Sequence, residues 1–155
     1  MEQNKISPLN RNNEELIFDL CENKYGFKPK LQFFKKGEKK IWAFKGKISK
    51  DFFIDINKCT KIEIIGFYFG FIDENDLRLS NDACQLFRKE IKKNIFELND
   101  KQAEEWLKGN DLILEEKPDL KEGYIILKNK DELIGCGKLT GSRIWNYVNK
   151  ERRVR

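Results

Sequence analysis

The stretch of sequence that decides the fold is residues 122–155, which read EGYIILKNKDELIGCGKLTGSRIWNYVNKERRVR. Three runs rich in aliphatic, β-branched and aromatic residues, 123–128, 132–138 and 143–148, are separated by residues that favour turns. Several short strands in close succession are typical of a small mixed β-barrel. The sequence therefore predicts a barrel whose last strand continues into the C-terminal tail.

The same stretch carries an excess of positive charge. It contains one acid, Glu151, between residues 138 and 155, against six Lys or Arg, namely Lys138, Arg143, Lys150, Arg152, Arg153 and Arg155, a local net charge of +5. Trp145 and Tyr147 lie among them. Cations bind phosphate, and aromatic faces stack on unpaired bases. The pattern favours a polyanion as the partner of this edge.

A second cationic segment lies in the N-terminal half. Residues 24–50 contain ten Lys and one acid, Glu38, which gives a local net charge of +9. Two separated positive segments indicate a polyanion that touches both halves of the chain. The alternative is a solvated surface whose charges are neutralised by salt bridges.

Periodicity and capping signals place the remaining elements. Asn12 or Asn13 is expected to cap a helix over 14–24 that stops at Gly26. Ser80 or Asn81 is expected to cap a second helix over 81–93. Asn99 and Gln102 resemble a capping box that opens a third helix, which ends at Gly109. The predicted strands are 31–34, 41–44, 52–56, 62–71, 95–98 and 112–114, together with the three C-terminal runs.

These elements predict an α+β protein. Residues 1–93 are expected to form an N-terminal α/β module, and residues 94–155 a C-terminal mixed β-barrel. The helix at 81–93 is expected to join the two modules.

Composition excludes several classes of protein. No apolar run approaches the roughly 20 residues that span a bilayer, and the N-terminus lacks the plan of a signal peptide, so a cytoplasmic protein without membrane contact is expected. The four cysteines, Cys21, Cys59, Cys84 and Cys136, lie far apart and the chain has no histidine. We therefore expect buried, reduced thiols and neither a metal site nor a cofactor.

Catalytic residues are not expected either. The sequence has no glycine-rich loop of the kind that holds a cofactor, and Cys136 lies in a strand pattern with no histidine anywhere to act as its base. The run Gly135-Cys136-Gly137-Lys138 lacks the spacing of a phosphate-binding loop. Its glycines more simply allow close approach of strands in a tight barrel.

Several short motifs follow one another in a familiar order. They are Leu79-Ser80, Ala83, Gln85-Leu86, Lys93 to Leu98, Trp106 to Leu112, Leu133 to Lys138, Arg143 to Tyr147 and Lys150 to Arg153. In this order and spacing the chain resembles, over about residues 77–155, the C-terminal PUA-type RNA-binding region of the NOL/NOP/Sun family of RNA cytosine-5 methyltransferases. It departs from the family pattern at Asn149, where the family favours Pro.

The resemblance implies an RNA groove beside the loop between the helix and the following strand. Carried onto this sequence, that loop is Lys108-Gly109-Asn110. The groove residues would be Lys108, Gly109, Lys138, Arg143, Asn146, Tyr147, Lys150, Arg152 and Arg153. Two alternatives stay open: Lys108-Gly109 as an ordinary helix C-cap, and Trp145 as a core residue, which we favour. Trp106 is expected in the core.

The resemblance also implies a function. We expect a non-catalytic protein that binds structured RNA, either rRNA or tRNA, in RNA modification or ribosome biogenesis. One alternative is a protein-interaction subunit that docks onto a separate RNA-modification enzyme. A weaker alternative is a small enzyme whose site the sequence does not reveal. RNA retention that falls steeply with salt would favour the RNA-binding function. Co-purification with an enzyme that survives high salt and nuclease would favour the docking subunit.

Overall fold

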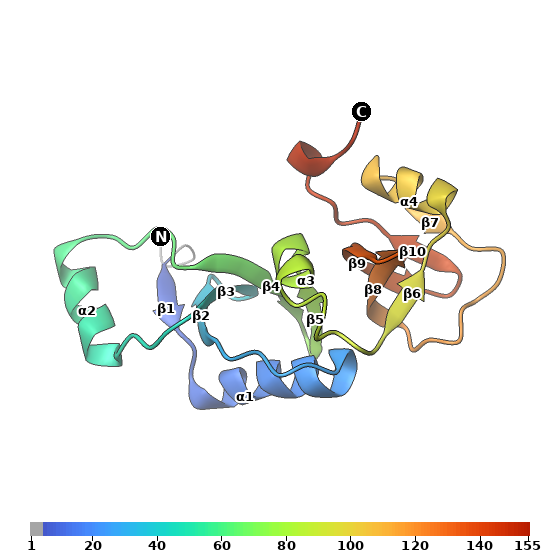
Figure 1. Cartoon of the computed structure of the whole chain (residues 1–155). Helices are drawn as coiled ribbons and strands as arrows, with labels where there is room; N and C mark the ends of the chain where they lie inside the picture. Colours follow the sequence, from blue (N-terminus) through green and yellow to red (C-terminus); the bar gives the residue numbers. More distant parts are fainter. Residues whose placement is uncertain (1–4) are drawn as a thin grey trace.

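A computed structural model describes residues 5–155 as two five-stranded sheets side by side (Figure 1). The first sheet is antiparallel throughout and its strands follow chain order: β1 (Ile6–Pro8), β2 (Gln32–Lys36), β3 (Lys40–Phe44), β4 (Phe67–Asp73) and β5 (Asp76–Leu79). Each strand pairs with its predecessor, and short turns join β2 to β3 and β4 to β5, while helical segments lie in the other two connections. The expected turn at Lys36–Glu38 connects β2 and β3.

One face of this sheet is covered by an N-terminal helix. The helix α1 (Arg11–Asp19) begins at Asn10, whose side chain accepts from the Asn13 backbone, two or three residues before the predicted cap. It continues as the π-helix η2 (Leu20–Tyr25) and ends at Gly26 with φ 75°, as expected. Ile17 is buried, and the Phe18 ring meets the Phe33 ring of β2 edge-on at 5.4 Å.

Two predicted strands in the N-terminal half are wrong or too long. Residues 52–56 lie in a helix, α2 (Lys50–Cys59), which Ser49 caps at its N-terminus. The apolar run suggested a strand, but only Phe53 is buried, 5.4 Å from the Phe34 ring, while Phe52 and Ile54 face solvent. The predicted strand 62–71 begins only at Phe67, because Gly66 with φ 59° turns the chain just before it.

The helix expected over 81–93 is also shorter. Ser80 caps α3 (Asn81–Leu86) as predicted, but the helix ends at Phe87. The backbone amides of Lys92 and Lys93 both donate to the Tyr25 carbonyl, at 2.9 and 3.2 Å. Since these amides serve the end of η2, the chain between 87 and 93 leaves the helix.

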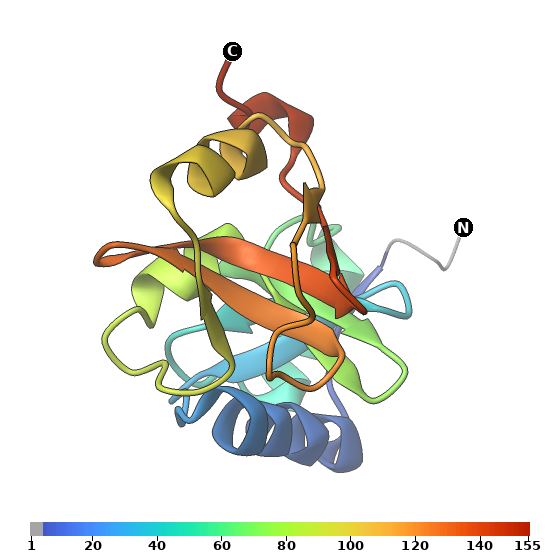
Figure 2. The same cartoon turned by 90° about the vertical axis from the view of Figure 1, so that its right-hand side faces the viewer.

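The second sheet is mixed and curled. Its order is β6 (Ile95–Glu97), β8 (Gly123–Asn129), β9 (Glu132–Thr140), β10 (Arg143–Trp145) and β7 (Leu112–Ile113), and only β6 and β8 are parallel. The helix α4 (Asp100–Leu107) lies across one end of this sheet, near the short 3-10 helix η3 (Lys150–Arg152) (Figure 2). The predicted capping box of Asn99 and Gln102 is confirmed.

A continuous core joins the two halves. Buried Tyr25 and Leu77 from the first half pack in one cluster with Tyr124, Ile126 and Cys136 from the second. Tyr25 donates its hydroxyl hydrogen to the Leu77 carbonyl and lies 3.8 Å from the Cys136 sulfur. The helix α3 contributes as predicted, since Gln85 on α3 donates to the Leu133 carbonyl of β9. The division into modules at residue 93 stays a prediction.

A second core cluster lies beneath α4, around the fully buried Trp106, where the sequence placed it. Three of the four cysteines are buried free thiols, but Cys59 is exposed at the end of α2, which corrects the expectation for that residue. Within residues 5–155, no helix is long and apolar enough to cross a membrane.

The shared core predicts that both halves unfold together. Ile126→Ala removes a fully buried side chain from β8 and should lower the free energy of unfolding by about 2–5 kcal/mol. The matched control is Ile113→Ala on β7, where the side chain is 70% exposed and the expected change is within about 0.5 kcal/mol. Denaturant unfolding followed by circular dichroism and tryptophan fluorescence should give one transition. Two separate transitions, only one of them shifted, would contradict a shared core.

Candidate functional site

The loop after α4 is folded as a helix C-cap and closed by the chain's own tail. Gly109 has φ 92°, and a Cβ at this position would overlap the Arg153 side chain. Lys108 pairs with Glu104 at 2.6 Å and Glu105 at 3.5 Å, and the hydrogen bond to Glu104 raises the pKa of Lys108. The space beside Gly109 is therefore occupied by the Arg153 side chain.

The C-terminal tail folds back onto both halves. Arg153 donates through Nε to the Val148 carbonyl at 3.2 Å, and the Val154 amide donates to the Leu107 carbonyl at 3.0 Å. Arg152 holds both carboxylate oxygens of Asp82, at the start of α3, at 3.0 and 3.1 Å. Lys150 is exposed, and within residues 5–155 no carboxylate lies within salt-bridge distance of it.

The strand β10 presents a cation and a ring to solvent. Arg143 pairs with Asp111 at 2.5 Å, and its guanidinium carbon lies 3.8 Å from the centre of the Trp145 ring. Trp145 is 40% exposed while Ile144 is fully buried. The favoured assignment of Trp145 to the core is therefore wrong, because the alternation along β10 turns Ile144 inward.

Asn146 is a structural residue in this arrangement. The side-chain nitrogen of Asn146 donates to the Trp106 and Asn110 carbonyls at 2.8 and 2.9 Å, and its side-chain oxygen accepts from the Val148 backbone amide. Its backbone amide donates to Asp111. These bonds end β10 earlier than the predicted strand end at residue 148 and fix the loop after α4 to the chain that follows β10.

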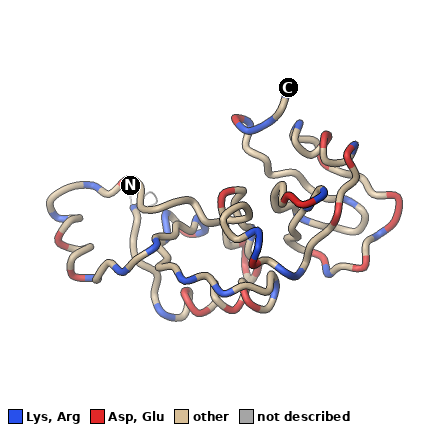
Figure 3. The backbone as a smooth tube through the Cα atoms, viewed as in Figure 1, with Lys and Arg blue, Asp and Glu red and all other residues tan. Residues whose placement is uncertain are grey.

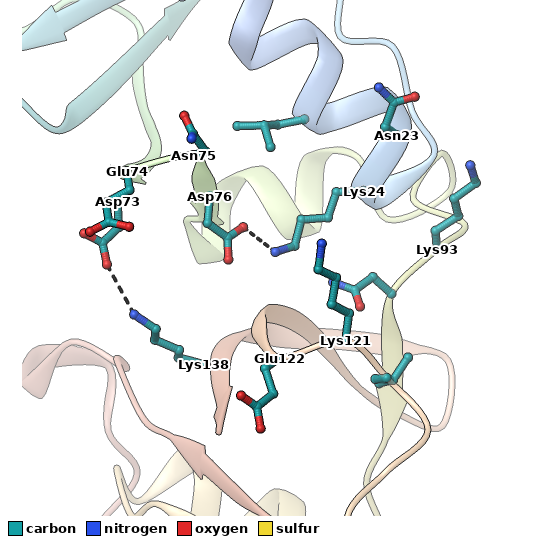
Figure 4. A pocket seen from close by; sticks show the side chains of 13 residues that line it. Asn23, Lys24, Asp73, Glu74, Asn75, Asp76, Lys93, Lys121, Glu122 and Lys138 are labelled. Atoms are coloured by element: carbon teal, nitrogen blue, oxygen red, sulfur yellow. Dashed lines mark hydrogen bonds and ion pairs between the residues drawn. The ribbon is translucent and has the colours of Figure 1, made fainter. Parts of the chain in front are cut away.

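The last predicted cation, Lys138, lies at the junction between the sheets. Its ammonium pairs with Asp73 at 3.3 Å, and Asp73 also pairs with Lys39 at 3.1 Å. The hydrogen bond from Lys39 lowers the pKa of Asp73 most, and the hydrogen bond from Lys138 lowers it further. Figure 4 shows the paired Lys138 and Asp73 at one side of a pocket, and this cavity has a volume of about 770 Å³. Four lysines and four acids line it: Lys24, Lys93, Lys121, Lys138, Asp73, Glu74, Asp76 and Glu122.

One of these acids also ties the sheets together. Asp76 pairs with Lys24 of η2 and accepts the backbone amide of Tyr124 on β8 at 2.9 Å. The formal charges that line this cavity balance, and Asp76 already has two partners, so the cavity offers no excess of positive charge to an anion.

Unneutralised charge is concentrated in the N-terminal segment instead. Of its ten lysines, Lys24, Lys28 and Lys39 form salt bridges. Within residues 5–155 the other seven have no carboxylate at salt-bridge distance: Lys30, Lys35, Lys36, Lys40, Lys45, Lys47 and Lys50. Figure 3 shows Lys and Arg residues spread along the strands and loops of the first half. The two predicted patches thus differ, and the tail is the more neutralised one.

Sequence reasoning missed Arg78 on β5. Its guanidinium carbon lies 4.3 Å from the centre of the Tyr147 ring and 5.0 Å from that of Phe71. Tyr147, which was predicted as a groove residue, is thus brought against a cation of the other half. The one signal in the sequence is the alternation in which Arg78 stands between the buried Leu77 and Leu79 and must point to the opposite face.

The buried cysteine between the halves is not an activated nucleophile. Burial raises the pKa of the Cys136 thiol to about 11, so that it is protonated near neutral pH. Within residues 5–155, no group of three or more potential metal-ligating acids or cysteines comes together.

Comparisons with known proteins show what the chain, and above all its C-terminal half, is similar to. Residues 93–154 match the family model of the methyltransferase RsmF PUA domain. Over 147 residues the chain is 27% identical to the ribosomal RNA small subunit methyltransferase F of Erwinia tasmaniensis. This match covers 94% of the chain but 29% of the enzyme's length. The resemblance to a methyltransferase PUA region that the motifs indicated is confirmed.

A solved structure shares the fold. The hypothetical protein PH0734.1 from Pyrococcus horikoshii OT3 superposes with a TM-score of 0.61 at 9% identity. The superposition covers 94% of this chain and 96% of that protein. At this low identity the likeness concerns the fold alone.

The Asp111–Arg143 pair predicts a pH dependence. The hydrogen bond from Arg143 lowers the pKa of Asp111, so this carboxylate stabilises the fold above its unfolded pKa of about 3.9 and loses that contribution as the pH falls through the folded value. Asp111→Asn should reduce the free energy of unfolding at pH 7, and its difference from the parent should shrink below about pH 4. Asp119→Asn, at an exposed site, is the control. A difference that stays constant from pH 7 to pH 2 would contradict the pairing.

Proposed function

We propose that this chain is a non-catalytic RNA-binding protein that recognises structured RNA and acts in RNA modification or ribosome biogenesis. The match of residues 93–154 to the RsmF PUA domain carries the proposal. The name of the Erwinia enzyme favours ribosomal RNA over tRNA as the target. In this proposal the N-terminal α/β module packs on a C-terminal PUA-like barrel.

The distribution of charge supports a contact with RNA phosphates. Seven lysines of the segment 24–50 lack carboxylate partners within residues 5–155, and six of them are exposed. Arg143 and Trp145 add an exposed cation and ring on the second sheet. Binding of this kind depends mainly on phosphate neutralisation and on the shape of the RNA.

Two observations support the absence of catalysis. Burial raises the pKa of the Cys136 thiol at the junction of the sheets to about 11, so that it is protonated near neutral pH. A cofactor-binding loop is missing from the sequence.

A second function, docking onto an RNA-modification enzyme, is favoured by a different surface. The helix α2 and the segment after it expose Phe52, Ile54 and Ile64, at 57%, 51% and 67% of their surface. Such side chains suit a protein partner better than RNA phosphates.

The RNA-binding proposal predicts the effect of removing lysines. Lys35, Lys36 and Lys40 changed together to Gln should weaken binding of rRNA fragments and reduce the slope of log K against log salt by up to about 2 to 3, since each phosphate contact contributes about 0.7 to 0.9. Changing Arg152 and Arg153 to Gln should reduce it by at most about 1 to 2. Filter binding at several salt concentrations measures both.

The control removes three lysines that are already neutralised. Lys58, Lys117 and Lys130 pair with Asp55, Glu122 and Asp100, so their triple change to Gln alters the net charge equally but should leave the slope nearly unchanged. Equal slopes in the parent and both test variants, with all proteins folded, would favour the docking function instead.

The absence of catalysis has its own test. Incubation of the chain alone with a labelled methyl donor and total RNA should give no transfer above background. Reproducible transfer that a Cys136→Ser change abolishes would refute the non-catalytic assignment.

A further inference from the structure

Rings and cations alternate along the outer face of the first sheet. Trp42 on β3 and Tyr68 on β4 are cross-strand neighbours whose ring centres lie 5.9 Å apart. The Lys36 ammonium, on the adjacent strand β2, lies 6.0 Å from the centre of the Trp42 ring. Phe34 on the same face is covered by α2, so the uncovered part of the face runs from Lys36 toward the second sheet.

The series continues across the junction through Arg78. This guanidinium lies between the rings of Phe71 and Tyr147, and Tyr147 in turn meets Tyr124 edge-on at 6.0 Å. Within residues 5–155, Arg78 forms no salt bridge, although it is half-buried. A partly desolvated cation without an acidic partner is costly unless a ligand or the ring faces compensate it.

A cavity of about 280 Å³ opens at this point, and Tyr68, Arg78 and Tyr147 contribute to its wall. Its charged residues are Arg78, Arg152 and Asp82, a net charge of +1, whereas the larger junction cavity is neutral. Its size is at the lower limit of small-molecule sites, which suits one base and not a base pair.

The polar groups of the cavity suit a nucleotide. Asn81 is half-buried at its wall, and within residues 5–155 its side chain has no hydrogen-bond partner. An amide can donate to and accept from the edge of a base. Arg152 lies at the rim, where its pair with Asp82 is about half exposed on both sides and hence weak. Its guanidinium is thus available to a phosphate.

We propose that this cavity binds a single unpaired base of RNA, stacked on Tyr147 or Tyr68, with the neighbouring phosphates at Arg78 and Arg152. The inference rests on the proposed RNA-binding function and names the part of the RNA that the junction of the sheets recognises. It moves the base contact away from the loop at Gly109, which the tail occupies. The structured RNA is then one with a bulged or unpaired nucleotide.

The test compares three kinds of hairpin that differ at one position. They are a single-nucleotide bulge with each of the four bases in turn, the same bulge with an abasic nucleotide, and a fully paired stem. The parent protein should bind the best base-containing bulge roughly 5- to 150-fold more tightly than the abasic one, the range expected when one stacked base is lost. 2-Aminopurine at the bulge should be quenched on binding.

Three variants locate the effect. Tyr147→Leu and Arg78→Gln should bring the ratio of base-containing to abasic affinity close to 1, and Tyr147→Phe, which keeps the ring, should retain it. The matched controls are Phe52→Leu, an exposed ring on α2, and Arg88→Gln, an exposed arginine on the turn after α3, both of which should keep the parent ratio. Thermal midpoints check that each variant folds, and Arg78→Gln keeps the test decisive if Tyr147→Leu does not fold.

The outcomes separate this inference from the function on which it rests. Tight RNA binding with equal affinity for base-containing and abasic bulges would overturn the cavity assignment and leave the RNA-binding function standing. Failure to bind any hairpin, rRNA fragment or tRNA would overturn both. A nucleoside monophosphate that binds the cavity as tightly as the bulged RNA would assign the site to a free nucleotide and refute the RNA assignment.

Discussion

The arrangement of the whole molecule depends on one buried tyrosine. Tyr25 closes the N-terminal helix, and its hydroxyl donates to β5 while its carbonyl receives the amides of Lys92 and Lys93. Its hydroxyl also contacts Cys136 on β9. The end of a helix, an edge strand, the connection between the halves and the second sheet therefore meet at a single residue. Together with the hydrogen bonds from Gln85 to Leu133 and from Tyr124 to Asp76, this residue holds the two sheets against each other.

Local signals in the sequence predicted local structure well. The caps at Ser80 and Asn99 and the stop at Gly26 were correct because each depends on hydrogen bonds within a few residues. The strand predicted at 52–56 was wrong because β-propensity reflects packing against neighbours, and here only Phe53 has a buried neighbour. The short α3 could not be predicted, since amides about 67 residues beyond Tyr25 are involved.

The site was harder to predict because charge counts along a sequence ignore distant partners. Arg143, Lys138 and Arg152 contributed to a cationic segment, yet they pair with Asp111, Asp73 and Asp82, which lie 32, 65 and 70 residues away. The segment 24–50 kept its charge because few acids lie opposite it. The role of Arg78 was missed for a related reason, since its ring neighbour Tyr147 lies in the other half of the chain.

The shared core has a consequence for synthesis on the ribosome. The first sheet and α3 are complete by Leu86, but Tyr25, Leu77 and Cys84 are covered by side chains from 124 to 136. At about 5–20 residues per second, the missing cover emerges roughly 3 to 10 seconds later. During that interval the nascent chain displays an apolar face beside a finished sheet, which is the kind of surface that chaperones bind. Translation speed through residues 87–136 thus determines how long that surface lacks its native cover.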